Sequence, residues 1–336
     1  ADMRGALKIL QAGAGVSIQD AGRWGYLRYG VTATGPMDVL AHEAANLAAE
    51  RPAGAAAIEI SLGGVELVCE GASVGVSIVA GGFRVTLDGA SLPDACRLTL
   101  HPGQKLAVRA GPSGAWAYVA PFARIDRAPA LGSLSMHARS GMGGAGLVAG
   151  ETIALADACE GPTAPHPLGS IREAGEAGPI RIVPGPQNDY FDHENFEAFL
   201  RGPWRVSLRS DRMAYAMEGP KIGHAKGFNI VSDGIAFGAI QIPGDGQPFV
   251  QMADRAPTGG YPKIGTVIAA DLGRLAQMRA GATLSFAAVS VDKAVEAWRS
   301  AREAMFAALS AGDSATLSSE ELLARNLIGG VVSADE

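Results

Sequence analysis

Short runs of apolar or alternating residues, each ended by a glycine turn, fill most of the chain. Examples are GVELVCE, RVTLDG and KLAVRAG, and similar runs recur through the first three hundred residues. Alternation with a period of two is typical of strands that bury one face, and glycine supplies the tight turns between them. With 45 glycines and only 18% charged residues, the chain is poorly suited to long solvated helices. The sequence therefore predicts a mainly β fold.

The length of 336 residues favours two domains over one. Residues 159–180 are rich in proline, glycine and alanine and poor in large apolar side chains, so this segment is a candidate linker. We expect a first β region over 1–165, a second over 175–290 and a helical tail over 291–336.

A glycine turn followed by a strand recurs in three places, which are 103–106, 150–153 and 281–284. Weak internal similarity of this kind indicates related β-barrel units, although a common turn type alone explains it equally well.

Four segments have the apolar spacing of helices. The first is residues 35–50, with Pro36 at the expected first helical position. Asp38 lies in the first turn, where a carboxylate interacts favourably with the positive end of the helix dipole. The other three helices are expected over 192–202, 291–312 and 320–336.

Charge and cysteine usage exclude several classes of function. A formal net charge of -6 provides no basic field for nucleic acid, and no stretch reaches the ~18 apolar residues of a membrane span. The N-terminal residues lack the apolar core of a secretory signal, so we expect a cytoplasmic protein. Cys69, Cys96 and Cys159 are widely spaced, which predicts reduced and mostly buried thiols. The histidines are equally scattered, and no metal site is expected.

Four segments carry more polar side chains and glycines than folding alone requires, and they are 17–38, 184–191, 207–220 and 239–268. For the first three segments, the sequence supports a structural role and a functional role about equally. An Asp20–Arg23 ion pair, a helix N-cap at Asn188 or Asp189, and a surface turn would explain them. Their candidate site residues are Asp38, Gln187, Asp211 and Arg212.

The segment 239–268 is the strongest candidate for a site. Its prolines restrict the backbone, and Gly259–Gly260 permits tight turns between them. A preorganised site requires such a loop, because its polar groups must be held in place before the substrate arrives. Turns alone would not need so many amide and charged groups. Its candidate site residues are Gln241, Gln247, Asp254, Thr258, Tyr261 and Lys263.

Two familiar nucleotide motifs do not apply. The run Gly141–Gly146 matches GxGxxG, but the residues after it have the pattern of a strand, whereas a dinucleotide site needs a helix there. The chain contains no GxxxxGK[ST] loop. The run Gly71–Gly75 matches GxSxG, but the residues after it have the pattern of a strand and not of the helix that a nucleophile elbow needs, so neither P-loop ATP binding nor α/β-hydrolase chemistry is expected.

Six motifs in order carry a resemblance to a known family. They are QDAGRWGYLRYGVTATGPMD, HARSGMGGAG, PGPQNDYF, SDRMAYAMEG, GAIQIPGDGQP and MADRAPTGGYPKIGTVIAADL, within about residues 7–290. With these motifs the chain resembles the biotin-dependent carboxyltransferase family. That family includes the C subunit of 5-oxoprolinase, the carboxyltransferase region of urea carboxylase (allophanate hydrolase subunit 2) and the Kip-type antagonist of a sporulation kinase inhibitor. The resemblance implies two cyclophilin-like β-barrel units.

The resemblance also implies partners. For a chain that stands alone, it implies the C subunit of an ATP-dependent 5-oxoprolinase, which works with an A subunit and a Kip inhibitor-like B subunit to convert 5-oxo-L-proline to L-glutamate. The chain would bind no cofactor by itself, because ATP would be used through the partner subunits. Arg212 or Lys263 would bind the substrate carboxylate, and Asp211, Asp254, Gln241 and Gln247 would contact the lactam.

Two other functions fit the same motifs. In a carboxyl transfer to urea or another small amide, Asp254 would be the general base and Lys263 the positive group, and biotin would come in trans because the chain has no MKM-type attachment site. Alternatively, the chain regulates a Kip-type inhibitor without catalysis. The site loops differ from the family pattern at four positions, which are Ala214, Ala216, Ala256 and Pro257.

Overall fold

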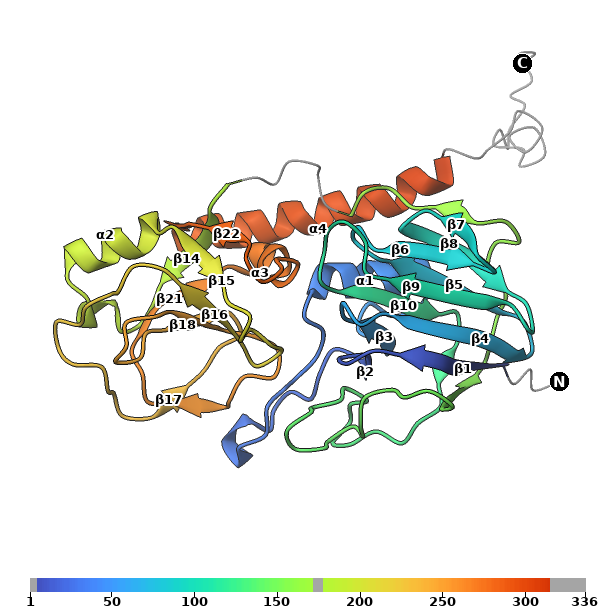
Figure 1. The fold of residues 1–336 in the computed structure, drawn as a ribbon, viewed down its shortest axis with the longest axis horizontal. Helices are drawn as coiled ribbons and strands as arrows, with labels where there is room; N and C mark the ends of the chain where they lie inside the picture. Colours follow the sequence, from blue (N-terminus) through green and yellow to red (C-terminus); the bar gives the residue numbers. More distant parts are fainter. Residues whose placement is uncertain (1–4, 172–177, 315–336) are drawn as a thin grey trace, which may run out of the picture.

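The computed structural model describes residues 5–171 and 178–314, so the helix expected over 320–336 lies outside the described residues. Figure 1 shows two β-rich units side by side, with helix α4 (Val291–Ser314) running along both. We call residues 5–167 the first unit and residues 180–288 the second unit. The predicted mainly β fold, with a few short helices and a C-terminal helix, is confirmed.

Two antiparallel sheets enclose an apolar core in the first unit. The seven-stranded sheet has the order β11 (Arg124–Ile125), β12 (Thr152–Ala156), β1 (Gly5–Ala12), β4 (Val65–Gly71), β9 (Lys105–Arg109), β6 (Arg84–Leu87) and β7 (Ala90–Leu92). The six-stranded sheet has the order β13 (His166–Pro167), β8 (Ala95–Leu100), β5 (Val74–Val79), β10 (Ala117–Pro121), β3 (Ala57–Ile60) and β2 (Ser17–Gln19). Since β13 pairs with β8, part of the predicted linker 159–180 belongs to this sheet.

Strand β10 of the six-stranded sheet is buried on both faces. Ala117 and Val119 lie in the core between the two sheets, whereas Tyr118 and Ala120 lie in a second core shared with helix α1 (Val39–Ala48) and the second unit. A strand covered on both faces needs a continuous apolar run instead of alternation. The second core joins the two units.

The second unit is built on one eight-stranded sheet. Its order is β22 (Thr283–Leu284), β15 (Trp204–Val206), β16 (Ala214–Glu218), β19 (Phe249–Gln251), β18 (Ala239–Gln241), β21 (Lys263–Val267), β14 (Ile180–Pro184) and β23 (Phe286–Ala288). The two edge strands, β22 and β23, are separated only by Ser285. The two edges of the sheet therefore approach each other, and the sheet curls into a nearly closed barrel. A two-stranded ribbon of β17 (Asp233–Gly234) and β20 (Thr258–Gly259) lies beside it.

The helices differ from the expectation in three details. Helix α1 begins at Val39, not Pro36, because Asp38 has an extended backbone and its carboxylate caps the helix by accepting from Ala41 N at 3.3 Å. Helix α2 (His193–Arg201) has the expected position, while α4 continues past Gly312 to Ser314. Helix α3 (Ala269–Ala276) was not expected, since it is short and its N-cap, Ile268, has no capping side chain. Two single 3₁₀ turns, at Leu27–Tyr29 and Asn188–Tyr190, complete the structure.

The three recurrent glycines of the turn-plus-strand pattern have the same conformation. Gly103, Gly150 and Gly281 have φ between 87° and 89°, in the left-handed region that favours glycine, and a strand follows each of them. Of the three thiols, Cys69 and Cys96 are buried and Cys159 is exposed.

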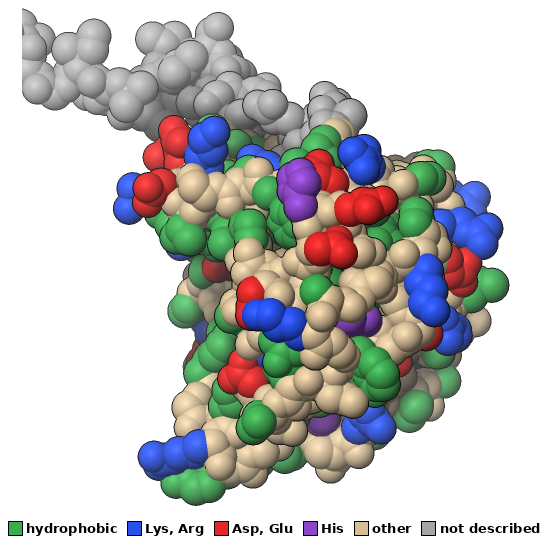
Figure 2. Space-filling model, turned by 90° about the vertical axis from the view of Figure 1, so that its left-hand side faces the viewer, with side chains coloured by type: hydrophobic (Ala, Val, Ile, Leu, Met, Phe, Trp, Pro, Cys, Tyr) green, Lys and Arg blue, Asp and Glu red, His purple; other side chains and the backbone are tan. Residues whose placement is uncertain are grey.

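Charges of both signs are mixed on the outer face of the second unit, as Figure 2 shows. Among the described helices, none has the length and apolar content needed to cross a bilayer.

Candidate functional site

A buried network of charged side chains lies where the two units meet. Arg212, in the connection between β15 and β16, donates from Nη1 to Glu59 on β3 of the first unit. Its Nε and Nη2 also donate to the two carboxylate oxygens of Asp254, at 3.1 and 3.0 Å, and Nη2 donates to Gly35 O at 2.7 Å. All three charged side chains are at least nine-tenths buried. We call Glu59, Arg212 and Asp254 the junction triad.

Opposite charges and hydrogen bonds compensate the burial of Arg212 and Glu59 in the junction triad. Burial opposes the charge of Arg212, but Glu59 and Asp254 more than offset it and hold the Arg212 pKa above its usual value. Burial raises the pKa of Glu59 above its usual value, and Arg212 and two further donors offset that rise only in part. Those donors are Met37 N and Tyr118 Oη, both 2.8 Å from Glu59 Oε2. Because every contact to Glu59 comes from a donor, the geometry is that of an ionised carboxylate.

Asp38 connects this network to the rest of the second unit. Its backbone N–H donates to Tyr118 Oη at 2.8 Å, and its Oδ2 accepts from Gln277 Nε2 at 2.9 Å. Gln277 Oε1 in turn accepts from the backbone N–H groups of Ala115 and Trp116, at 2.8 and 3.0 Å. Asp38 therefore caps helix α1 and also binds the residue that follows α3, which fixes the relative position of the units.

A pocket of about 210 Å³ opens directly on Asp254. We call it the junction pocket, because one wall comes from the first unit and the other from the second. Its lining residues are Gly30, Val31, Thr32, His137, Arg139, Ser140, Met142, Met213, Asp254, Arg255, Ala256 and Pro257. Ala256 and Pro257, two of the positions that depart from the family pattern, thus form part of its wall. The glycine-rich run that mimics a dinucleotide motif belongs to the loop that supplies His137, Arg139 and Met142.

A second group of predicted residues surrounds Lys263 on β21. The Lys263 ammonium is buried and donates to Asp233 Oδ2 at 2.6 Å and to Gly234 O at 3.3 Å. Gln187 Oε1 accepts from Lys263 N at 3.3 Å, and Gln187 Nε2 donates to Asp233 at 3.5 Å. We call Lys263, Asp233 and Gln187 the lysine cluster. The ion pair with Lys263 contributes to a pKa of Asp233 below its usual range.

The lysine cluster is connected to the wall of the junction pocket through the backbone. Strand β17, which carries Asp233, pairs with β20, which carries Thr258. The residues just before Thr258 form the pocket wall, and Ile235 N donates to Pro257 O at 3.1 Å. A Cβ at Gly259 would lie 2.6 Å from Gln241 Nε2, so a larger residue there would displace the end of the Gln241 side chain. Tyr261 is 41% exposed, and its carbonyl accepts from Gln241 Nε2 at 3.4 Å.

Two predicted site residues lie in turns instead. The Asp211 carboxylate accepts from Met213 N and Ala214 N, at 2.8 and 3.1 Å, as in a surface turn. The Gln247 side chain bonds the backbone of Gly219 in both directions, at 3.0 and 3.3 Å. The structure therefore brings Asp38, Arg212 and Asp254 together, and separately Gln187, Gln241, Thr258, Tyr261 and Lys263.

The first polar segment organises the loop next to the pocket. The Asp20 carboxylate accepts from Ser133, Leu134 and Ser135, and these bonds lower its pKa against the effect of burial. Arg23 donates from Nε to Ala130 O at 3.3 Å. Asp20 and Arg23 therefore both bind the 130–135 segment, and the ion pair between them that was the structural alternative is not found among the described residues.

The sequence reasoning missed Glu59, Tyr118 and Gln277. Glu59 is the one that carried a signal, because it is a charged residue inside the fully buried strand Ala57–Ile60. A charge in such a run is costly unless a partner compensates it. Tyr118 and Gln277 look like ordinary core and helix-end residues.

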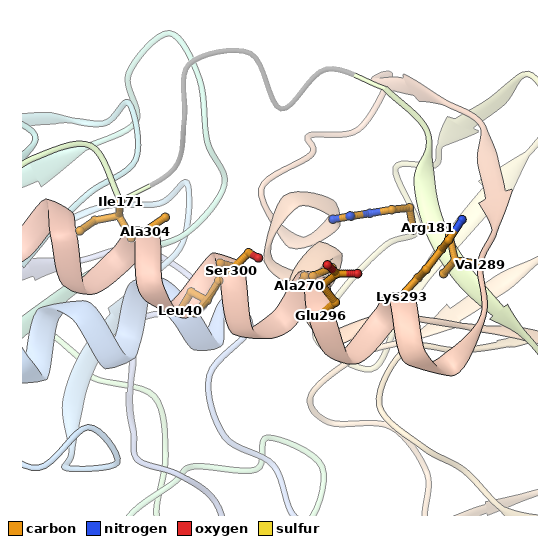
Figure 3. A pocket seen from close by; sticks show the side chains of 11 residues that line it. Leu40, Ile171, Arg181, Ala270, Val289, Lys293, Glu296, Ser300 and Ala304 are labelled. Atoms are coloured by element: carbon orange, nitrogen blue, oxygen red, sulfur yellow. The ribbon is translucent and has the colours of Figure 1, made fainter.

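A separate pocket of about 550 Å³ runs beside helix α4 and holds none of the predicted site residues. Figure 3 shows Arg181, Lys293 and Glu296 at one end of this pocket, and Leu40, Ile171 and Ala304 toward the other. The Arg181 guanidinium is bonded to Asp271 at 2.6 and 2.9 Å. Because the junction pocket is lined by the predicted residue Asp254 and the pocket beside α4 by none of the predicted residues, the junction pocket is the better candidate site.

Comparison with known proteins identifies the family of the chain. The family described as "Carboxyltransferase domain, subdomain A and B" matches residues 29–288, a span that includes the junction triad and the lysine cluster. The chain is 33% identical to the C subunit of 5-oxoprolinase from Escherichia coli over 297 residues, which are 87% of this chain and 94% of that protein. It is 32% identical to the C subunit of 5-oxoprolinase from Haemophilus influenzae, covering 86% and 93% of the two chains.

A solved structure is also similar. The urea carboxylase of Kluyveromyces lactis superposes with a TM-score of 0.82 and 26% identity, over 89% of this chain and 29% of that chain. The chain thus spans less than a third of that enzyme. With the family match over most of its length, the chain belongs to the carboxyltransferase domain family, subdomains A and B.

Proposed function

We propose that the chain is the C subunit of an ATP-dependent 5-oxoprolinase and that its junction pocket binds the lactam substrate. The observation that carries this proposal is the position of Asp254, which lines a small pocket between the units while Arg212 holds its carboxylate in a fixed orientation. Similarity to two 5-oxoprolinase C subunits along nearly their whole length supports the choice.

The pocket offers what a small lactam needs. A carboxylate that already accepts from Arg212 still has lone pairs for one more donor, and the lactam N–H of 5-oxoproline is such a donor. Val31, Met142 and Pro257 provide apolar walls for the ring methylenes. Because the acceptor is fixed before the substrate arrives, little orientation entropy is lost on binding.

Ring opening adds one water across the lactam C–N bond, which gives the γ-carboxylate and the α-amine of glutamate. We assign the use of ATP to the partner A and B subunits, and the binding and orientation of the lactam to this chain. Lys263 has a positioning role in this assignment. Its ammonium bonds Asp233 and Gly234, whose strand pairs with the one that follows the pocket wall.

Reconstitution tests the proposal. The purified chain is mixed with the A and B subunits, 5-oxo-L-proline and ATP, and glutamate release is followed. Glutamate should form only when all three proteins and ATP are present. Equal release without this chain, or no release with it, would contradict the assignment.

Similarity to the urea carboxylase structure favours one second candidate, which is carboxyl transfer to a small amide from biotin carried by another protein. Asp254 would then act as general base toward the acceptor nitrogen. Bicarbonate-dependent ATP use that requires a biotin carrier protein, together with no glutamate release, would identify this function.

A further inference from the structure

Arg255 is a buried cation with no carboxylate in hydrogen-bond contact among the described residues. It is 8% exposed, and its guanidinium donates only to backbone carbonyls within that part of the chain, to Ile235 at 3.0 Å and to Met252 and Ala253 at 3.4 and 3.5 Å. Burial lowers its pKa to about 10, and the nearby charge of Asp254 compensates only in part. A buried guanidinium in this state gains stability when an anion binds beside it.

Arg23 lines a small cavity together with Arg255 and is still more buried, at 2% exposure. Its Nε and Nη2 bind the carbonyls of Ala130 and Ser135, but its buried Nη1 has no hydrogen-bond partner within residues 5–171 and 178–314. The cavity has a volume of about 60 Å³ and shares four lining residues with the junction pocket. The shared residues are Val31, Thr32, Arg255 and Pro257.

Arg139 completes the positive wall of the junction pocket from the other unit. It is exposed, and in the described part of the chain its Nη1 contacts only the thioether of Met213, at 2.9 Å. His137 lies beside it and bonds Ser140 at 2.7 Å. Among the described lining residues the one acidic group, Asp254, already has both oxygens bonded to Arg212. The free positive charge of the pocket is therefore not balanced by these lining residues.

We infer that Arg139 and Arg255 form a carboxylate-binding subsite in the junction pocket, with Arg23 behind it as a third cation. The ligand class is a small carboxylate carried on a lactam ring, which places the acid group of the substrate between the two units. This inference rests on the proposed function and deepens it. Arg212 and Lys263 are not available for this task, because Glu59, Asp254 and Asp233 already bind their charged groups.

Two ligands that differ only in the carboxylate test the subsite. Calorimetric titration of the full chain with 5-oxo-L-proline and with 2-pyrrolidinone, the same lactam without the acid group, should give at least roughly tenfold tighter binding of 5-oxo-L-proline. Arg139→Gln should weaken the binding of 5-oxo-L-proline by about tenfold and leave that of 2-pyrrolidinone within about twofold. Because Arg139 is exposed, this variant is expected to fold normally.

Arg28→Gln is the matched control, since Arg28 is another arginine of the neighbouring loop but does not line the pocket. Its affinities should equal those of the wild type. Equal affinity for the two ligands, no binding of 5-oxo-L-proline, or an unchanged Arg139→Gln would each overturn the subsite.

The subsite and the proposed function can fail separately. Selective carboxylate binding without glutamate release in the reconstituted complex would retain the subsite and reject 5-oxoprolinase activity. Glutamate release with no difference between wild type and Arg139→Gln in the KM for 5-oxo-L-proline would reject the subsite and retain the activity.

Discussion

The guanidinium of Arg212, in the second unit, is bonded to the carboxylate of Glu59, in the first, and both side chains are buried. This contact is the point at which the packing of the two units and the chemistry of the candidate site meet. The same guanidinium orients Asp254 toward the junction pocket, so a change in the position of one unit would move the acceptor that the other unit holds.

Glu59→Ala should destabilise the protein, because it leaves three buried donors, Arg212 Nη1, Met37 N and Tyr118 Oη, without their acceptor. A buried donor left unsatisfied costs about 1–3 kcal/mol in the free energy of unfolding, so the total loss should exceed about 3 kcal/mol. Denaturant unfolding measures this loss. Glu66→Ala is the control, since Glu66 pairs with Arg109 at 2.8 Å near the surface and its loss should cost about 1 kcal/mol or less. Similar losses in the two variants would argue against a dominant role for the junction triad.

Acid should destabilise the fold through His42. Burial lowers the pKa of this imidazole to about 4, and its Nε2 lies 3.1 Å from Gln19 O. An unfolded histidine has a pKa of about 6.5, so between these values the unfolded chain takes up a proton that the folded chain excludes. The free energy of unfolding should therefore fall as the pH drops from about 6.5 to about 4, by on the order of 3 kcal/mol from this group.

Unfolding curves at several pH values check this prediction, and His42→Gln should flatten the dependence over that range. The NMR shifts of the His42 ring should also stay constant between about pH 8 and 5, well above the folded-state pKa of about 4. A titration midpoint near the ordinary histidine value in the folded protein would show that the imidazole is not held in its neutral form.

Lys263→Met should act on substrate binding more than on turnover. Loss of the Lys263 ammonium removes the ion pair with Asp233. This weakens the support of the β17–β20 strand pair, which leads to the wall of the junction pocket. We expect the KM for 5-oxo-L-proline in the reconstituted complex to rise roughly tenfold and kcat to stay within about twofold. Lys226→Met is the matched control, because Lys226 pairs with the exposed Asp189 on the surface. Equal kinetics for the two variants would remove the positioning role.

The strands and most helices could be predicted from the sequence because their signals are local. The glycine turns at Gly103, Gly150 and Gly281 depend on neighbouring residues alone. The N-cap of α2 is Asp192 and not Asn188 or Asp189, which lie in a separate 3₁₀ turn. Helix α3 escaped prediction, since its eight residues carry no capping side chain.

The candidate site was harder to predict, because it is assembled from distant segments. Arg212 and Asp254 stand in polar loops and were identified, whereas Glu59 contacts Arg212 across 153 residues of sequence. In the loop with Arg139, the glycine run mimics a nucleotide motif and the arginine itself follows no spacing that indicates a site. Asp211 and Gln247 were predicted as site residues, but their side chains form hydrogen bonds with the backbone of nearby loops and so have a structural role.

The rate of glutamate release by the reconstituted complex carrying Asp254→Asn tests the central claim most directly. The substitution keeps the size of the side chain and removes its charge, and Asp126→Asn, at an exposed surface pair, controls for charge alone. The account predicts that kcat/KM for 5-oxo-L-proline falls at least roughly tenfold in Asp254→Asn and is unchanged in Asp126→Asn. Wild-type kcat/KM in a folded Asp254→Asn complex would contradict it.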